Sequence, residues 1–166
     1  MIILKRDILI FPKFDNITLI EKVRKEHDNL YSILPPHITI VFPFVDNITN
    51  LDLFNKLSDI LKDFECFDVT FSGVNLSYDN YIFLNCTKGK ENIIKLHDLI
   101  YSSILPSHLN KNIPFIPHIT LGQASDISFL KNFNYEFSTN ISEISIEIIG
   151  ENEESIIYKN IKLKKI

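Results

Sequence analysis

"ILPPHITIVFPF" occupies residues 33–44, and its central tetrapeptide, Pro-His-Ile-Thr, returns in "FIPHITLGQA" at residues 115–124. A given tetrapeptide occurs by chance at roughly one position in 10⁵, so a second copy in one small chain has a chance on the order of 10⁻³. The repeat therefore has a structural cause, a functional cause, or both.

The repeated tetrapeptide lies within a repeat of secondary-structure patterns. In the first half, residue periodicity predicts a strand at 2–12, a helix at 16–30 capped by Asp15, a strand at 37–44, a helix at 50–64 and a strand at 66–76. In the second half, it predicts a strand at 81–86, a helix at 91–105, a strand at 118–122, a short helix at 126–133, and a closing hairpin of strands at 143–151 and 155–166. The chain thus reads as a duplicated β-α-β-α-β unit. We expect one α+β domain over residues 1–166, with one lobe at about 1–78 and the other at about 79–166.

Composition excludes several classes of partner. The chain is 45% hydrophobic and 23% charged, which is typical of a globular protein, and its formal net charge is −4. Only Arg6 and Arg24 are arginines among 17 basic residues, and no basic stripe suited to a nucleic-acid duplex is present. A phosphate would therefore be held by lysine, histidine, hydroxyl or backbone N–H groups rather than by several arginine forks.

The sequence also favours a cytoplasmic protein. Charges follow the fourth residue, which leaves no signal-peptide core, and no segment approaches the roughly twenty apolar residues of a membrane span. The two cysteines have no metal-binding or redox spacing, as expected of reduced thiols.

The repeated motif places polar groups on one face of each strand. Side chains alternate along a strand, so His37 and Thr39 point to one face and the intervening isoleucine to the other. His118 and Thr120 repeat this arrangement. Because imidazole and hydroxyl groups buried without partners would cost a few kcal/mol, we expect both polar faces to line one open cleft.

Two imidazoles in one cleft are suited to acid/base chemistry. The ordinary pKa of histidine allows one copy to be neutral and the other charged near neutral pH. One then takes a proton from an attacking hydroxyl or water, and the other protonates the leaving oxygen. Threonine hydroxyls can donate to the non-bridging oxygens of a phosphate. This chemistry requires neither a metal nor another cofactor.

The segments "YSILPPHITIVFPF" and "IPHITLGQ" resemble the two-histidine (2H) phosphoesterase superfamily, which includes the 2′-5′ RNA ligase and cyclic phosphodiesterase group, and look most like its small bacterial members. The resemblance covers nearly the whole chain. It implies a bilobal fold with two antiparallel-rich sheets around a central cleft, and metal-independent chemistry on 2′,3′-cyclic phosphates or 2′-5′ linkages. By motif match, it makes His37 and His118 the acid/base pair, and Thr39 and Thr120 the phosphate-binding hydroxyls.

Two further residues are candidates for substrate binding. Many relatives carry a basic residue after the glycine of the second motif, where this chain has Gln123, which can donate a hydrogen bond but brings no charge. Tyr31, just before the first motif, is placed to stack on a nucleobase at the rim of the cleft. The expected partner is a nucleotide or an RNA 3′ end, with neither a membrane nor a DNA duplex involved, and we expect a monomer.

Other interpretations fit parts of the pattern. In one interpretation, the repeat is a relic of duplication and the histidines are structural. In another, the two histidines bind a metal, although neither motif has the third ligand that zinc requires. A module that binds nucleotides or RNA ends without turnover would use the threonines but leave the paired histidines without a task. An enzyme for another small cyclic nucleotide would use the same groups. The sequence leaves open which histidine is the acid, and whether hydrolysis or the reverse ligation is favoured.

Overall fold

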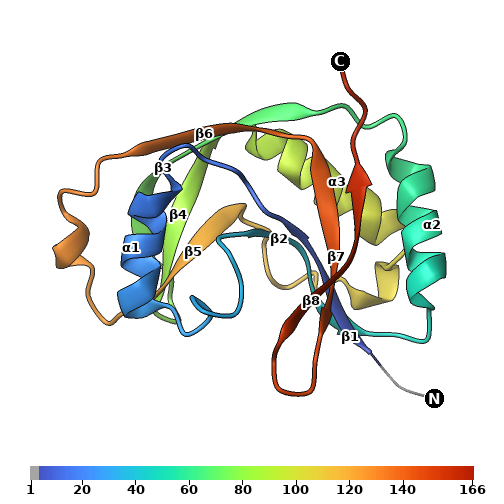
Figure 1. Cartoon of the computed structure of the whole chain (residues 1–166), viewed down its shortest axis with the longest axis horizontal. Coiled ribbons are helices and arrows are strands. Elements are labelled where there is room, and N and C mark those ends of the chain that lie inside the picture. The colour runs from blue at the N-terminus through green and yellow to red at the C-terminus, as the bar shows by residue number, and fades with distance from the viewer. Residues whose placement is uncertain (1–3) are drawn as a thin grey trace.

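The computed structural model describes residues 4–166, which form two four-stranded antiparallel sheets and three α-helices (Figure 1). The first sheet has the order β2-β1-β7-β8, with bounds β1 Lys5–Ile10, β2 Ile38–Val45, β7 Glu143–Ile149 and β8 Ser155–Lys162. The second has the order β5-β4-β3-β6, with bounds β3 Phe67–Leu76, β4 Tyr81–Lys88, β5 His118–Gln123 and β6 Glu136–Ile141. The helices are α1 Ile17–His27, α2 Asn50–Leu61 and α3 Lys90–Ser103, with 3₁₀ turns η1 Pro106–His108 and η2 Ser128–Leu130. The predicted α+β class is confirmed.

The local predictions are confirmed for most elements and wrong at three places. The short helix expected at 126–133 is only the single 3₁₀ turn η2, and strand β6 was not predicted. Asp15 does not cap α1, because the N-cap position is Asn16 and its side chain makes no capping hydrogen bond. Residues 2 and 3 of the expected first strand lie outside the described residues.

The two sheets exchange strands between the halves of the chain. Strand β3 comes from the first half but pairs with β4 and β6, whereas β7 comes from the second half and pairs with β1. The sheets therefore do not coincide with the lobes expected at 1–78 and 79–166. In each sheet, however, the strand with the Pro-His-Ile-Thr motif is the edge strand, and the strand before it in the chain is its neighbour.

The helices exchange sheets as well. Helix α1 follows β1 of the first sheet but packs against β5 of the second, and α3 follows β4 of the second sheet but packs against β2 of the first. In Figure 1, α1 lies at one end of the molecule, and α2 and α3 lie together at the other. Each motif strand is therefore covered by a helix that follows, along the chain, a strand of the other sheet.

The aliphatic positions of the two motif strands belong to the hydrophobic core. Ile38 and Ile40 of β2, and Ile119 and Leu121 of β5, are fully buried. Each such side chain contributes about 1.5–3 kcal/mol on burial. The histidines and threonines between them stay partly accessible on the opposite face, as the alternation predicts.

Cys66 and Cys86 are both free and buried. Across residues 4–166, no helix has the length and apolar character needed to cross a membrane.

A glycine in β5 permits the close approach of α1. The backbone of Gly122 has φ +134°, and a Cβ there would lie 2.3 Å from the carbonyl oxygen of His27 at the end of α1. Any larger residue would push the helix away from the strand that it covers.

We expect Gly122→Ala to lower the free energy of unfolding by about 3 kcal/mol or more, because it adds a backbone clash to an unfavourable φ. The matched control is Gly73→Ala, which also has a positive φ of +79° but open space around the new methyl group. It should cost only about 1 kcal/mol. Urea denaturation of both variants measures the difference, and equal losses would contradict the close-approach argument.

Two carboxyl groups oppose each other on the motif-bearing face of the first sheet. Asp7 of β1 is directly across from Glu147 of β7, and it shares a face with Thr39, because Leu9 pairs with Thr39. Burial, and then the Glu147 charge, raise the pKa of Asp7 to about 8. Burial also raises the pKa of Glu147, whose other oxygen accepts from Ser155. Near neutral pH the pair therefore keeps one proton, with Asp7 donating to Glu147.

This pair makes stability depend on pH. The folded state holds a proton on Asp7 that the unfolded chain releases near pH 3.8, so the free energy of unfolding falls as pH rises from about 4 to about 8. Asp7→Asn has no proton to release, and its advantage over wild type should grow by on the order of 2 kcal/mol between pH 5 and pH 8. Urea denaturation at the two pH values tests this, with the exposed Asp59→Asn as the control. An advantage that does not change with pH would contradict the assignment.

Candidate active site

The two motif histidines are held in the same way. Nδ1 of His37 lies 2.9 Å from the carbonyl oxygen of Pro35, and Nδ1 of His118 lies 2.6 Å from that of Ile116. A carbonyl only accepts, so Nδ1 is the protonated nitrogen of each neutral ring. This leaves Nε2 of both rings as the atom that can take up or release a proton.

The fold brings the two histidines near each other. Strands β2 and β5 are edge strands of different sheets, and they contact each other directly. The charge of His118 is close enough to lower the pKa of His37. The cleft predicted between the two polar faces therefore lies where the two sheets meet.

Both histidines have a pKa below the ordinary 6.5, and burial is the main cause. For His37, the hydrogen bond to Pro35 raises the pKa, Arg24 lowers it, Asp28 raises it and His118 lowers it, in decreasing order of effect. For His118, the only other contribution is the hydrogen bond to Ile116, which raises the pKa. Both imidazoles are therefore mainly neutral at pH 7 when the site is empty.

Threonine hydroxyls accompany both imidazoles. Thr39 and Thr120 are partly buried and lie two residues after the respective histidine, on the same face of the strand. Each sheet thus contributes one imidazole and one hydroxyl to the region between the sheets.

A phenylalanine ring contacts each imidazole, and the sequence pattern did not predict these contacts. Phe83 of β4 stacks on His118, with ring centroids 3.6 Å apart and an interplanar angle of 18°. Phe11 meets His37 edge-on at 6.3 Å. Both phenylalanines lie in or just after the strand that pairs with the motif strand. Only the strand register, which the sequence pattern does not contain, would have revealed these contacts.

The other two predicted site residues, Tyr31 and Gln123, are both exposed. Tyr31 is 38% exposed and belongs to the segment that leads into the first motif. Gln123 is exposed at the end of β5, opposite Tyr81 in the register. Their roles in substrate binding stay predictions.

Neither arginine is available to a ligand. Arg6 and Arg24 are each only 1% exposed, and both donate to groups within the protein. Arg24 lies beside the first motif, because it donates to the carbonyl of Leu34. In the sequence, it occupies a position of the helix pattern at 16–30 where an apolar residue is expected, and this is the feature that could have pointed to it. Within residues 4–166, no cluster of three or more His, Cys, Asp or Glu side chains is arranged to hold a metal ion.

Bacterial proteins that carry the name of phosphoesterases have similar sequences. A protein of Geobacillus sp. strain WCH70 with the name "Putative phosphoesterase" is 27% identical over 123 residues, covering 72% of this chain and 69% of its own. A protein of the same name from Bacillus anthracis is 29% identical over 149 residues, covering 80% and 83%.

Solved structures share the fold. Escherichia coli LigT, crystallised with 3′-AMP, superposes with a TM-score of 0.75 at 18% identity, covering 98% of this chain and 99% of LigT. TT0787 of Thermus thermophilus gives 0.70 at 10% identity, covering 97% and 98%. The model of the 2′-5′ RNA ligase superfamily matches residues 12–146, which include both motifs, the whole second sheet and, of the first sheet, β2 and the start of β7. The chain therefore belongs to the 2′-5′ RNA ligase superfamily of two-histidine phosphoesterases.

Proposed function

We propose that the protein is a metal-independent phosphoesterase that hydrolyses a 2′,3′-cyclic phosphate or a 2′-5′ phosphodiester of a nucleotide or RNA 3′ end. The observation that carries this proposal is the equivalent pair of imidazoles, each with Nδ1 bound to a carbonyl two residues upstream. Such a pair leaves two Nε2 atoms for proton transfer. A site that only binds nucleotides would not need either.

The chemistry follows from these groups. One Nε2 accepts the proton of a water or a ribose hydroxyl as its oxygen forms a bond to phosphorus. The other Nε2, protonated at the start, gives its proton to the ribose oxygen as its bond to phosphorus breaks. After one turnover the two imidazoles have exchanged protonation states. The reverse direction of the same step joins two ends.

Substrate charge favours a phosphodiester. Because Arg6 and Arg24 are engaged within the protein, the phosphate meets Thr39, Thr120 and one imidazolium. One positive charge and neutral hydroxyl donors match the single negative charge of a cyclic or linear diester better than the higher charge of a monoester or polyphosphate. The 3′-AMP bound by LigT is a phosphate monoester, so it supports a nucleotide ligand for this fold but not the choice of ester.

The proposal is tested by incubating EDTA-treated protein with the four 2′,3′-cyclic mononucleotides and with 2′-5′-linked dinucleotides, resolving 2′ from 3′ products. We expect turnover without metal, reduced by about 10² or more in His37→Ala and in His118→Ala. His27→Ala is the matched control, because that imidazole stacks on Phe129 and is not among the groups that shift the pKa of His37 or His118. Ligand binding without product from the wild type would favour a binding module, and turnover equal to wild type in both motif variants would contradict the mechanism.

The pH dependence of kcat/KM should have its optimum below pH 6.5. The reaction needs one neutral and one protonated imidazole, and burial lowers the pKa of both in the free enzyme. Activity therefore falls with rising pH once both rings are neutral, and with falling pH once both are protonated. A profile measured from pH 4 to pH 9 with the best substrate tests this, and an optimum above pH 7.5 would contradict it.

A further inference from the structure

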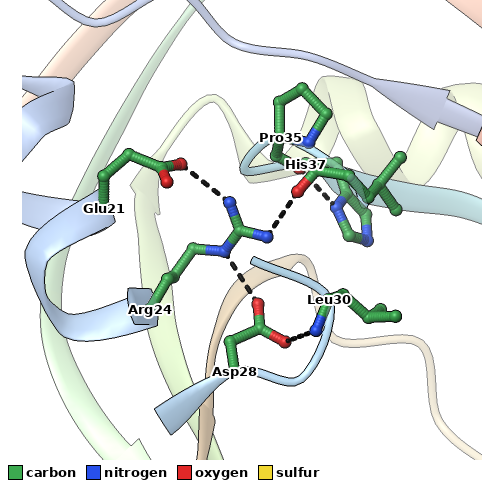
Figure 2. Close-up of polar contacts among 7 residues, drawn as sticks. Glu21, Arg24, Asp28, Leu30, Pro35 and His37 are labelled. Atoms are coloured by element: carbon green, nitrogen blue, oxygen red, sulfur yellow. Dashed lines mark hydrogen bonds and ion pairs between the residues drawn. The ribbon is translucent and has the colours of Figure 1, made fainter. Parts of the chain in front are cut away.

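The peptide segment before His37 is held by a buried arginine (Figure 2). Nη2 of Arg24 lies 2.5 Å from the carbonyl oxygen of Leu34. The next carbonyl along the chain, that of Pro35, accepts from Nδ1 of His37. Because the two carbonyls belong to successive residues, fixing the first restricts the direction of the second.

Arg24 is itself fixed by two carboxylates. Nη1 lies 2.7 Å from Oε1 of Glu21, and Nε lies 2.7 Å from Oδ2 of Asp28. The other oxygen of Asp28 accepts from the backbone N–H of Leu30, at the start of the same segment. Figure 2 shows the guanidinium at the centre of this arrangement, with donors directed to all three partners. Its orientation is therefore determined on every side.

The arrangement links the two sheets. Arg24 lies in α1, which packs against β5 of the second sheet, whereas the segment that it holds leads into β2 of the first. The orientation of His37 thus depends on a helix attached to the strand that carries His118.

We propose that Arg24 is a positioning residue for His37: by holding the Leu34 carbonyl it directs the Pro35 carbonyl onto Nδ1, which keeps Nε2 free for proton transfer. The catalytic consequence rests on the function proposed above, but the effect on the ring itself does not. Arg24 does not touch the reacting atoms, and it acts only through the segment and through its charge.

The charge of Arg24 supplies a second readout. The charged groups acting on His37 are Arg24, Asp28 and His118, and of these Arg24 and His118 lower its pKa whereas Asp28 raises it. Removing the guanidinium would leave Asp28 without its ion-pair partner. Both effects raise the pKa of His37.

His118 serves as an internal comparison. Its upstream segment has a different support, because the ring of Phe115 stacks on His97 of α3 with centroids 3.9 Å apart. Arg24 is not among the groups that shift the pKa of His118. A change at Arg24 should therefore alter the signals of His37 far more than those of His118.

The test compares Arg24→Gln with Arg6→Gln. Arg6 is a matched control, because it is equally buried and also donates to backbone carbonyls, those of Asp46 and Ile48. These carbonyls follow the C-terminal end of β2, and Arg6 is not among the groups that shift the pKa of His37. Imidazole ¹H–¹⁵N correlation spectra recorded from pH 4 to pH 9 report the tautomer and titration midpoint of each ring. Each ring is assigned from the loss of its signals in His37→Ala or His118→Ala.

We expect His37 to be a single Nδ1–H tautomer in wild type and in Arg6→Gln. In Arg24→Gln, an Nε2–H population should appear, and the His37 midpoint should rise by about half a pH unit or more. With a substrate that the wild type turns over, kcat should fall about tenfold or more while KM changes less than about twofold. Arg24→Lys, which keeps the charge but not the fork, should change the tautomer with little change in the midpoint.

Unchanged His37 signals in Arg24→Gln, with a loss of thermal stability like that of Arg6→Gln, would overturn the proposal. If Arg24→Gln does not fold, unchanged His37 signals in Arg24→Lys would overturn it equally. The spectra need no substrate, so the positioning role of Arg24 and the phosphoesterase function can be contradicted independently of each other. An inactive wild type with a fixed His37 tautomer would count only against the phosphoesterase function.

Discussion

The alternation of side chains along β2 and β5 is the constraint on which the rest of the structure depends. Each strand carries large aliphatic side chains on one face and the imidazole and hydroxyl on the other, so one face requires a cover and the other requires access. The aliphatic face of each strand is covered by a helix that follows a strand of the other sheet, α1 on β5 and α3 on β2. Separating the sheets would uncover both aliphatic faces. The packing that stabilises the fold is therefore the same packing that brings the two polar faces together.

The distribution of positive charge decides how the site treats an anion. Both arginines are used inside the protein to hold backbone carbonyls, and Asp7 and Glu147 keep a proton on the motif-bearing face of the first sheet. The carboxyl pair thereby avoids placing a second negative charge on that face. A phosphate would then be attracted mainly by a protonated imidazole. Ligand binding and proton uptake are thus linked, because an anion between the two rings favours the state in which one of them is charged.

The features that depend on local sequence pattern could be predicted correctly. The Pro-His-Ile-Thr strands, the three helices and the closing hairpin follow from periodicity, and the alternation within each motif predicted which faces are buried. The features that depend on pairing between segments far apart in the chain could not be predicted. The pairing of β3 with β4 and β6, and of β7 with β1, is fixed by contacts between segments far apart in the chain. Strand β6, with the sequence "EFSTNI", is too polar to stand out alone. It is a strand because it pairs along β3.

The two histidines of the candidate site were singled out from the sequence, but the residues that support them were not. His37 and His118 were found because the motif repeats, whereas Phe83 and Phe11 became visible only through contacts in the folded chain. Arg24 did leave a local signal, a charged residue at an apolar position of a helix. Its meaning depends on the Leu34 carbonyl ten residues later, which no periodicity connects to it.

The supports of the two histidines have diverged although their hydrogen bonds have not. An ion-paired guanidinium fixes the segment before one ring, and a stack of aromatic rings fixes the segment before the other. Phosphoryl transfer treats the two sides of the phosphate differently, since one oxygen arrives as the other departs. Two identical imidazoles in identical surroundings would have no preference for either protonation state. A cation near one ring and an aromatic face on the other remove that equivalence. The different supports would thus allow the two copies of the motif to take different parts in the proposed reaction.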